Sequence, residues 1–447
     1  MNKFTFINHA SYIVETVNSI LLVDPWVEGY AFDKGWALLD KSTSNEDLID
    51  FINNKMKTIY IWLSHEHSDH FSIPFLMLLK KKNVKAKFLF QKTLDGRVSE
   101  FIRKIGFEVF ESNDKKISID PELSIVIFPF AGGDSYCLTI LRECSILNLN
   151  DCVINDEIAL NRVITNVNKY TSKIDLLLTQ FGYANWIGND NESELRVSSA
   201  TEKLSRIKLQ VEGLQPKNLL PFASFIYFCD KENFHINDCQ NTPKNVEKLF
   251  KNNNFECNLI VLKPMDQLKL SDELSIQSKL LNGPNIMYWE SLAKNIKPEL
   301  INKSLYTQID IINEYENYRK KIFQAFLFAP NLLERFNFLV PIDIYINDLD
   351  IIFSMSYTRK LIVKKGKIND ADLSLSSSTM MFILKNEYGS NTAHVNGKFY
   401  RLKFDGVKKF MRHFSPQEYM KMGYGLNRPF ITFKNVFGKL ISKFFNK

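Results

Sequence analysis

Short apolar runs separated by turn residues dominate the first part of the chain. Phe4 to Ile7, Tyr12 to Thr16 and Ser19 to Val23 are rich in β-branched and aromatic residues, which is typical of strands. Asn8-His9 and Val17-Asn18 supply turns between them. The pattern predicts three strands at the edge of a first sheet, which Asp24-Pro25 ends because proline cannot continue a central ladder.

Farther along, predicted strands alternate with helical periodicity. A capping-box-like start at Ser44 predicts a helix to Asn54, and a long helix is expected from Arg196 to Leu214. This β/α succession is typical of half a two-layer sandwich and predicts an α/β domain over residues 1–290. Its other strands are expected at 58–63, 87–90, 107–110, 117–130, 137–141, 145–149, 175–179, 219–222 and 258–262.

The pattern changes at about residue 290. Helices are expected at 298–316 and 318–329, followed by an alternating pair of segments at 343–355 and 360–365. We therefore predict an appended α+β domain over residues 291–425. Residues 426–447 are basic and aromatic and place several apolar side chains on one helical face. Packing on its own domain is favoured over contact with a membrane surface or a partner.

Composition narrows the class of protein. The 447 residues include 45% hydrophobic residues, which is typical of a globular protein large enough for two or three domains. Six cysteines without a CxxC pair argue against a disulfide framework or a cysteine-bound metal cluster. No apolar run approaches the length that crosses a bilayer, and no targeting segment is evident at Met1. We expect a soluble, cytoplasmic protein.

The net charge of +7 does not indicate a particular class of partner. It is compatible with a small anionic substrate, but solvated lysines account for it equally well and are the favoured explanation. No nucleic-acid-binding motif is present, so no nucleic acid partner is expected. Nothing in the sequence indicates an oligomeric state.

The strongest chemical signal follows the predicted strand at residues 58–63. His65, His67, Asp69 and His70 fall within six positions at the end of this strand, in a chain with seven histidines. Chance clustering of surface histidines is disfavoured on that ground. Imidazole and carboxylate together suit one or two divalent cations such as Zn, Fe or Mn. Asp151 is a second candidate ligand, because a predicted hairpin delivers it at a strand end; an Asx turn is the alternative.

The pattern His-x-His-x-Asp-His after a hydrophobic strand resembles the signature of the metallo-β-lactamase superfamily, whose fold is an αββα sandwich. Further stretches are similar to the C-terminal part of CMP-N-acetylneuraminate hydroxylases, over roughly residues 10 to 290. These stretches are 22–26, 31–36, 149–152, 178–181, 214–216 and 221–223.

The resemblance implies roles for particular residues. Asp151 would bridge two metals, with Asp69 and His70 on one side and His65 and His67 on the other, and Asp69 would also orient a reacting water. A loop that includes Gln180 and Tyr183 would face the substrate, together with Asn150.

Two ligands expected from the superfamily are missing. No histidine occurs between His70 and His235, so the third histidine of the first metal is absent. Asp134 is a candidate substitute, unless the glycines before it form an opening for substrate. For the last ligand Asp230 is preferred, with His235 five residues beyond. A carboxylate in place of imidazole moves the metal preference from Zn toward Fe or Mn.

Three functions follow from this pattern. The leading hypothesis is a hydrolase that uses a metal-activated water. The resemblance alone suggests a phosphorylated or nucleotide-sugar substrate. The second hypothesis is an oxygenase component with a separate electron donor, because no Rieske domain of the hydroxylase family precedes the sandwich. The third is a scaffold with a decayed metal site, which the metal content of the purified protein would distinguish.

Overall fold

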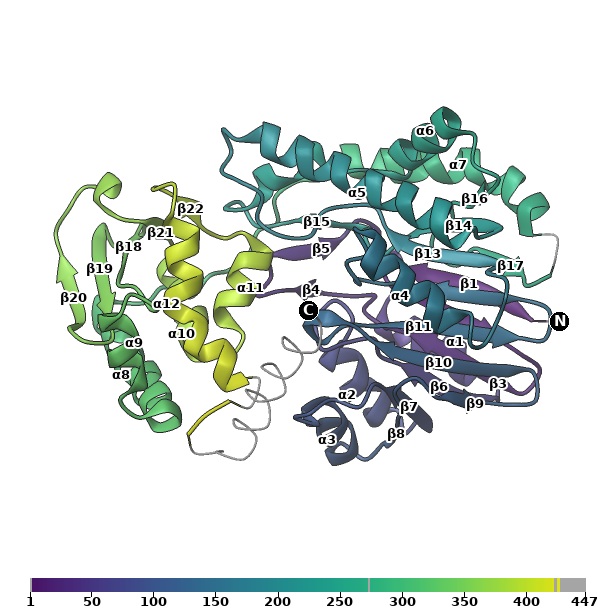
Figure 1. Cartoon of the computed structure of the whole chain (residues 1–447), viewed down its shortest axis with the longest axis horizontal. Coiled ribbons are helices and arrows are strands. Elements are labelled where there is room, and N and C mark those ends of the chain that lie inside the picture. Colours follow the sequence, from purple (N-terminus) through teal and green to yellow (C-terminus); the bar gives the residue numbers. More distant parts are fainter. Residues whose placement is uncertain (1, 272–273, 422–423, 427–447) are drawn as a thin grey trace. The chain divides into compact units, whose positions relative to one another are not determined.

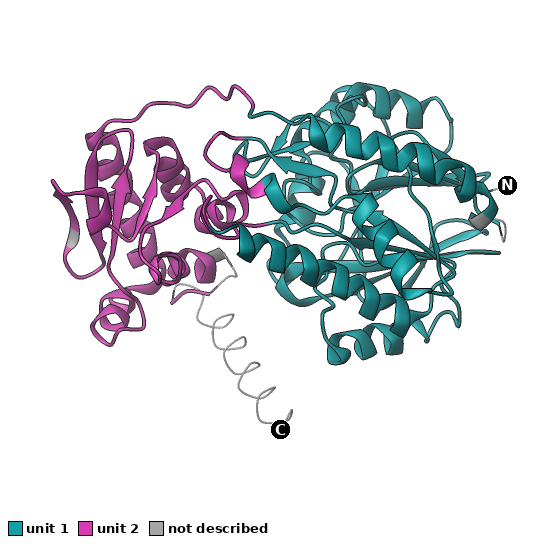
Figure 2. Cartoon of the chain, turned by 90° about the horizontal axis from the view of Figure 1, so that it is seen from above, with its two compact units in different colours: residues 1–184, 192–229, 237–298 teal, residues 185–191, 230–236, 299–447 magenta. Residues whose placement is uncertain are grey.

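A computed structural model describes residues 2–271, 274–421 and 424–426, and these form two compact units. The first unit comprises residues 1–184, 192–229 and 237–298, and the second comprises residues 185–191, 230–236 and 299–447 (Figure 2). The second unit thus includes two short segments that lie within the sequence of the first. The predicted C-terminal helix at 426–447 lies almost entirely outside the described residues.

The first unit contains two seven-stranded mixed sheets (Figure 1). The order of the first sheet is β17 (Gln267–Lys269), β1 (Lys3–Asn8), β2 (Ser11–Glu15), β3 (Ser19–Val23), β6 (Thr58–Trp62), β7 (Ala86–Phe90) and β8 (Glu108–Glu111). The order of the second is β16 (Asn258–Leu259), β14 (Asn218–Phe222), β13 (Leu176–Gln180), β12 (Ser145–Asn148), β11 (Ser135–Leu141), β10 (Leu123–Pro129) and β9 (Lys116–Ser118).

Alternation along the strands explains how the layers pack. In β1 and β2, Phe4, Phe6 and Tyr12 contribute to a core shared with the second sheet, whereas Ile7 and Ile13 belong to a separate core. That separate core is completed by α1 (Asn45–Asn53), α2 (Ile73–Lys81) and α3 (Arg97–Lys104). On the second sheet, α4 (Glu157–Val167), α5 (Ser193–Leu214), α6 (Pro243–Asn253) and α7 (Leu274–Lys294) contribute buried residues. Helices therefore cover the outer face of each sheet, and the unit is an αββα sandwich, as predicted.

Smaller elements complete the first unit. A three-stranded sheet consists of β15 (Ile226–Phe228), β5 (Trp36–Leu38) and β4 (Tyr30–Ala31). A short 3-10 turn, η1 (Ala131–Gly133), precedes β11, and a second one, η2 (Phe234–Cys239), follows β15. No helix among the described residues is long and apolar enough to span a bilayer.

The second unit is an α+β unit. Its five-stranded sheet has the order β20 (Lys360–Lys364), β19 (Ile351–Ser356), β18 (Ile342–Ile346), β21 (Leu373–Leu375) and β22 (Tyr400–Arg401). Its helices are α8 (Gln308–Phe326), α9 (Ala329–Arg335), η3 (Ile368–Asp370), α10 (Ser377–Lys385), α11 (Gly389–Asn396) and α12 (Gly406–Lys421).

The division differs from the boundary that we predicted at residue 290. Helix α7 runs through this position, and Trp289 is fully buried in the core of the sandwich, where its Nε1 donates to the carbonyl of Leu262 at 2.8 Å. The predicted helix at 298–316 begins only at Gln308, where Thr307 caps it and accepts a hydrogen bond from the backbone of Asp310. The capping residue, rather than apolar spacing, sets the start of this helix.

A buried histidine in the second unit gives a pH-dependent stability. The ring of His413 is buried, stacks on Tyr357 and lies with Nδ1 2.9 Å from the carbonyl of Val340. Burial lowers the pKa of His413 to about 4. Above about pH 6.5 the ring is neutral in the folded and unfolded states. As the pH falls from there toward 4, the unfolded chain takes up a proton that the folded protein does not, so the free energy of unfolding decreases.

We expect this decrease to be about 2–3 kcal/mol between pH 7 and 4.5. His413→Asn keeps a donor near Val340 without a titrating ring and should remove that part of the pH dependence. Urea denaturation of both proteins at the two pH values measures the difference, and equal pH dependence in the two proteins would contradict the prediction.

Candidate metal centre

The candidate ligands lie at one edge of the sandwich. Parallel strands β3 and β6 in the first sheet, and β12 and β13 in the second, deliver their carboxyl ends there. His65 to His70 follow β6, and Asp151 follows β12. Because side chains that follow parallel strands gather outside the carboxyl ends, segments far apart in sequence meet at this edge.

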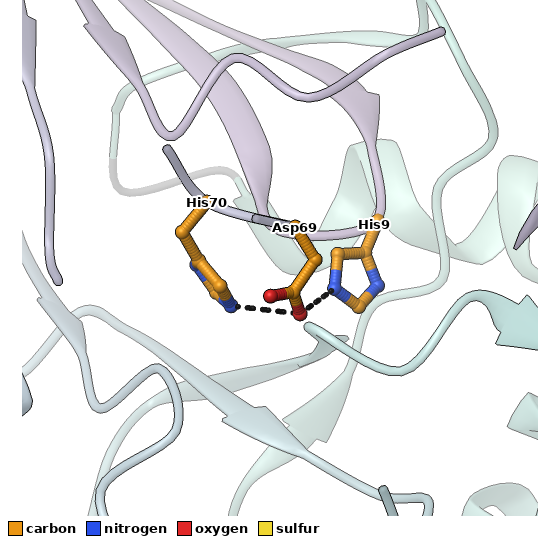
Figure 3. Close-up of side chains that lie close together, drawn as sticks. All are labelled: His9, Asp69 and His70. Atoms are coloured by element: carbon orange, nitrogen blue, oxygen red, sulfur yellow. Dashed lines mark hydrogen bonds and ion pairs between the residues drawn. The ribbon is translucent and has the colours of Figure 1, made fainter. Parts of the chain in front are cut away.

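The first ligand group consists of His9, Asp69 and His70 (Figure 3). Nε2 of His9 lies 3.4 Å from Oδ2 of Asp69, and Nε2 of His70 lies 3.3 Å from the same oxygen. All three residues are buried. His9 occupies the tight turn between β1 and β2 with a φ of 34°, which aims its ring at Asp69.

The second group consists of His65, His67 and Asp134, and a third joins His65 and His70 through Asp151. In each group the ligand atoms lie within 4.8 Å of one another. Oδ1 of Asp151 is 3.4 Å from Nε2 of His70, and its Oδ2 is 3.8 Å from Nε2 of His65. Asp151 therefore presents one oxygen to each of the first two groups, which is the arrangement of a bridging carboxylate.

Asp24, directly after β3, is hydrogen-bonded to His70 and to two residues that flank the cluster. Its Oδ2 accepts hydrogen bonds from Oγ of Ser64 at 2.7 Å and from Nδ2 of Asn150 at 2.7 Å, and it lies 2.9 Å from Nδ1 of His70. A proton held on Nδ1 by this carboxylate leaves the lone pair of His70 on Nε2, which faces Asp69 and Asp151. Asp24 thus sets both the ring orientation and the tautomer that a metal ligand needs.

The donor set fits a divalent cation. Nε2 of His70 and Oδ1 of Asp69 are buried, and neither has a hydrogen-bond partner within the described part of the chain. Buried polar atoms are normally satisfied, and a cation coordinated by these atoms would satisfy both. The cluster could hold a divalent metal ion, and its donor types alone do not select one metal.

The charges in the cluster act strongly on one another. Burial would raise the pKa of Asp151, but the charge on the neighbouring His70 holds this pKa well below its usual range. Burial would lower the pKa of His70, yet Asp69 and Asp151 hold it well above its usual value. Burial, with a further contribution from Asp151, raises the pKa of Asp134 to about 7. A cation would therefore displace protons from this cluster when it binds.

The predicted substrate contacts have other positions. Asn150 is 1% exposed and donates to Asp24, so it supports the cluster instead of meeting a substrate. Tyr183 is 2% exposed, which leaves little of its side chain to contact a substrate. Gln180 is half-buried at the end of β13, and its Nε2 donates to Oδ1 of Asp151 at 2.7 Å.

Asp230 belongs to none of the ligand groups found among the described residues. Asp230 belongs to the second unit, where its carboxylate is buried and lies 2.9 Å from Nζ of Lys303. His235 is in the same unit, with Nε2 3.4 Å from the carbonyl of Gly188. The ammonium of Lys303 thus pairs with Oδ1 of the carboxylate that the sequence offers as the last ligand, whereas His9 belongs to one of the ligand groups.

Two members of the cluster carried a weak sequence signal. His9 is a histidine in a two-residue turn between strands, and Asp24 is an aspartate placed between a strand and a proline. Either pattern is common without any chemistry. Only the pairing of β1 with β2, and of β3 with β6, brings these two residues to the motif at 65–70.

The fold and the site together define the class of protein: an αββα sandwich with a His/Asp cluster at its strand ends. The chain is similar to cytidine monophosphate-N-acetylneuraminic acid hydroxylases. It is 23% identical over 279 residues to the protein of Macaca mulatta, covering 56% of this chain and 43% of that protein. It is 25% identical over 266 residues to the protein of Danio rerio, covering 55% of this chain and 42% of that protein.

These relatives are much longer than the region that aligns, so the chain spans less than half of the two proteins named. An inactive human hydroxylase aligns with 23% identity over 56% of this chain and 51% of the relative. No family model matches the chain.

Solved structures with a similar arrangement include a mutant of CmlA beta-hydroxylase. That structure aligns with a TM-score of 0.42 and 16% identity, covering 60% of this chain and 54% of the other. The short form of human tRNase Z aligns with a TM-score of 0.34 and 10% identity, covering 60% of this chain and 99% of the other.

Proposed function

We propose that the chain is an iron-dependent oxygenase that hydroxylates an organic substrate at the cluster around Asp151. The observation that carries the proposal is the composition of the two groups on either side of this carboxylate. His9, Asp69 and His70 make one, and His65, His67 and Asp134 make the other. Each contains two imidazoles and one carboxylate, the ligand set that non-haem Fe(II) oxygenases use.

The ligand set changes the order of the functions suggested by the sequence. The motif at 65–70 favours a hydrolase, but Asp134 would replace an imidazole in the second group, and His9 with Asp69 gives the first group the same composition. Harder oxygen donors favour Fe or Mn over Zn. Similarity to hydroxylases over 56% of the chain supports the same order.

Hydroxylation also defines what else the reaction needs. One atom of O₂ enters a C–H bond of the substrate, and the other leaves as water, which takes two electrons and two protons from a reductant. Bound iron would supply the transfer of electrons to O₂. We propose that a separate one-electron carrier supplies the electrons.

The residues of the chain have separate roles in this proposal. The two groups would hold the ions, and Asp151 would be shared between them. Asp24 keeps the proton of His70 on Nδ1, and Gln180 holds Oδ1 of Asp151 through its amide. The deep burial of Asp69 and His70 would shield these two ligands from bulk water, whereas Asp134 and Asp151 stay partly exposed on the side that a substrate could approach.

Hydrolysis is the second candidate, and one observation favours it. The two oxygens of Asp151 face different histidines, so two cations could lie on either side of one carboxylate. Paired cations held in this way activate water and stabilise a leaving oxygen in many hydrolases.

A metal exchange experiment separates the two candidates. Protein purified from iron-supplemented cells is reduced with dithionite under argon, freed of the reductant by anaerobic gel filtration and then mixed with air-saturated buffer, while oxygen is recorded. We expect retained iron and oxygen uptake that Asp151→Asn removes. The zinc-loaded protein is assayed in parallel with bis(p-nitrophenyl) phosphate. Selective retention of zinc, with hydrolysis that Asp151→Asn removes, would replace the proposal by the hydrolase.

Asp134 provides a test of the metal preference itself. Asp134→His gives its group three imidazoles, and we expect the ratio of zinc to iron bound in competition to rise by about tenfold, because imidazole is the softer ligand. Asp134→Glu keeps the carboxylate and should leave the ratio close to that of the unsubstituted protein. Metal analysis after dialysis against equal concentrations of both ions measures the ratio. An unchanged ratio in Asp134→His would show that Asp134 does not bind the metal.

A further inference from the structure

A chain of hydrogen bonds leads from the metal centre to a lysine. Nε2 of Gln180 donates to Oδ1 of Asp151 at 2.7 Å, and Oε1 of the same amide accepts from Nζ of Lys203 at 3.0 Å. Lys203 lies on α5, which packs on the second sheet. The amide of Gln180 has one orientation that satisfies both neighbours, and the lysine fixes it.

Lys203 is a half-buried cation without a carboxylate partner. In the described ranges of the chain no carboxylate oxygen lies within 4.0 Å of its Nζ, and Asp151 and Glu202 act on it only at longer range. Arg206, one turn farther along α5, pairs with Glu202 and adds a second positive charge on that side of the helix. Burial, with a smaller contribution from Arg206, lowers the pKa of Lys203 to about 8.

This arrangement has an energetic consequence. An ammonium group has three donors, and Gln180 accepts one hydrogen bond from it. A cation removed from water is costly unless an anion pairs with it, and no carboxylate of the described residues pairs with Lys203. A carboxylate or phosphate oxygen placed beside Gln180 would form charge-assisted hydrogen bonds with this ammonium and would lie next to the ligand Asp151.

We propose that Lys203 binds the anionic group of the substrate, a carboxylate or a phosphate, beside the metal centre. The inference deepens the proposed function, because it names the substrate class of the same site. It does not depend on which reaction the centre catalyses. Lys203 would also act as a positioning residue, since its bond to Oε1 of Gln180 turns Nε2 of that amide toward Asp151.

Anion binding can be measured without a known substrate. Inorganic phosphate and acetate are titrated by calorimetry into the zinc-loaded full-length protein, with the metal content determined for each sample. We expect one of the two anions to bind, and its affinity to fall by at least about tenfold in Lys203→Met. The anion that binds assigns the group as phosphate or carboxylate.

Two variants serve as controls. Lys203→Arg keeps the positive charge and should retain the anion affinity within about threefold. Lys208→Met removes an exposed lysine of the same helix, which pairs with Glu212, and should also retain the affinity within about threefold. Metal content should be equal in all variants. Unchanged affinity in Lys203→Met, a loss that occurs only together with the metal, or no binding of either anion to the unsubstituted protein would overturn the inference. Oxygen uptake by the iron form is a separate readout, so failure of the oxygenase proposal would leave this result intact.

Discussion

Replacing Asp151 with asparagine is expected to remove the carboxylate that both ligand groups share, and with it most of the metal affinity and activity. The amide of asparagine has a single oxygen, so it cannot present one acceptor to His70 and another to His65 as the carboxylate does. Losses of 10–100-fold are typical when residues behind a ligand are changed, and a shared ligand should cost more than about 100-fold in metal affinity and activity. Metal analysis after dialysis, together with oxygen uptake by the reduced protein, measures both.

Asp114→Asn is a matched control for this substitution. Asp114 is exposed, and its φ of 55° is a conformation that asparagine tolerates well. Metal content and activity should remain those of the unsubstituted protein. Full metal occupancy in Asp151→Asn would mean that the carboxylate does not bind metal, and the cluster would then need a different explanation.

Asp24→Asn is expected to have the second large effect, through both stability and metal affinity. Oδ1 of Asp24 accepts a hydrogen bond from the backbone nitrogen of Ser64 at 2.8 Å. Its Oδ2 is hydrogen-bonded to Oγ of Ser64, Nδ1 of His70 and Nδ2 of Asn150. An amide must direct its NH₂ group at one of these sets of donors. Breaking a buried charged network of this kind costs about 3 kcal/mol of unfolding free energy. Loss of the support behind His70 should lower metal affinity by about 10–100-fold.

The two effects can be separated with a second buried aspartate. Asp40 is 4% exposed and accepts from hydroxyl groups of Ser42 and Tyr288, and it belongs to none of the ligand groups found among the described residues. Asp40→Asn should therefore reduce stability without reducing metal affinity. Urea denaturation and competition with a chelator give the two quantities. Normal metal affinity in Asp24→Asn would show that Asp24 is structural only.

Much of the centre could be predicted because it is local in sequence. His65, His67, Asp69 and His70 share one strand end, so the spacing alone places them together. Asp151 required one further step, the expectation that β12 ends at the same edge as β6. The structure places these residues in overlapping groups, with their ligand atoms close together.

The remaining members depend on packing that no local pattern records. The ring of His9 reaches Asp69 only because β1 pairs with β2 and the turn between them adopts a positive φ. Asp134 follows η1, where Gly132 has a φ of 85° that turns the chain back toward His65. The sequence leaves open whether such glycines shape a ligand loop or an opening.

Asp230 shows how distant sequence sets the surroundings of a position expected from a family. A ligand is expected near the end of β15, and a carboxylate is present there. Lys303, which lies over seventy positions farther along the chain, pairs with this carboxylate. Lys398 approaches the same carboxylate to 3.9 Å. The composition around Asp230 gave no sign of either lysine, because both belong to the C-terminal unit.

The two short segments that join the second unit have a consequence for how the chain acquires its structure during synthesis. Residues 185–191 and 230–236 leave the ribosome about two hundred residues before the strand and helix that complete their surroundings. Until then Trp186 lacks Phe399, on which its ring stacks at 5.2 Å, and Asn233 lacks the carbonyl of Asn396. A nascent sandwich would carry Trp186 without this contact while about half of the 447 residues are synthesised, so chaperone dependence and aggregation of fragments ending near residue 298 should exceed those of the complete chain.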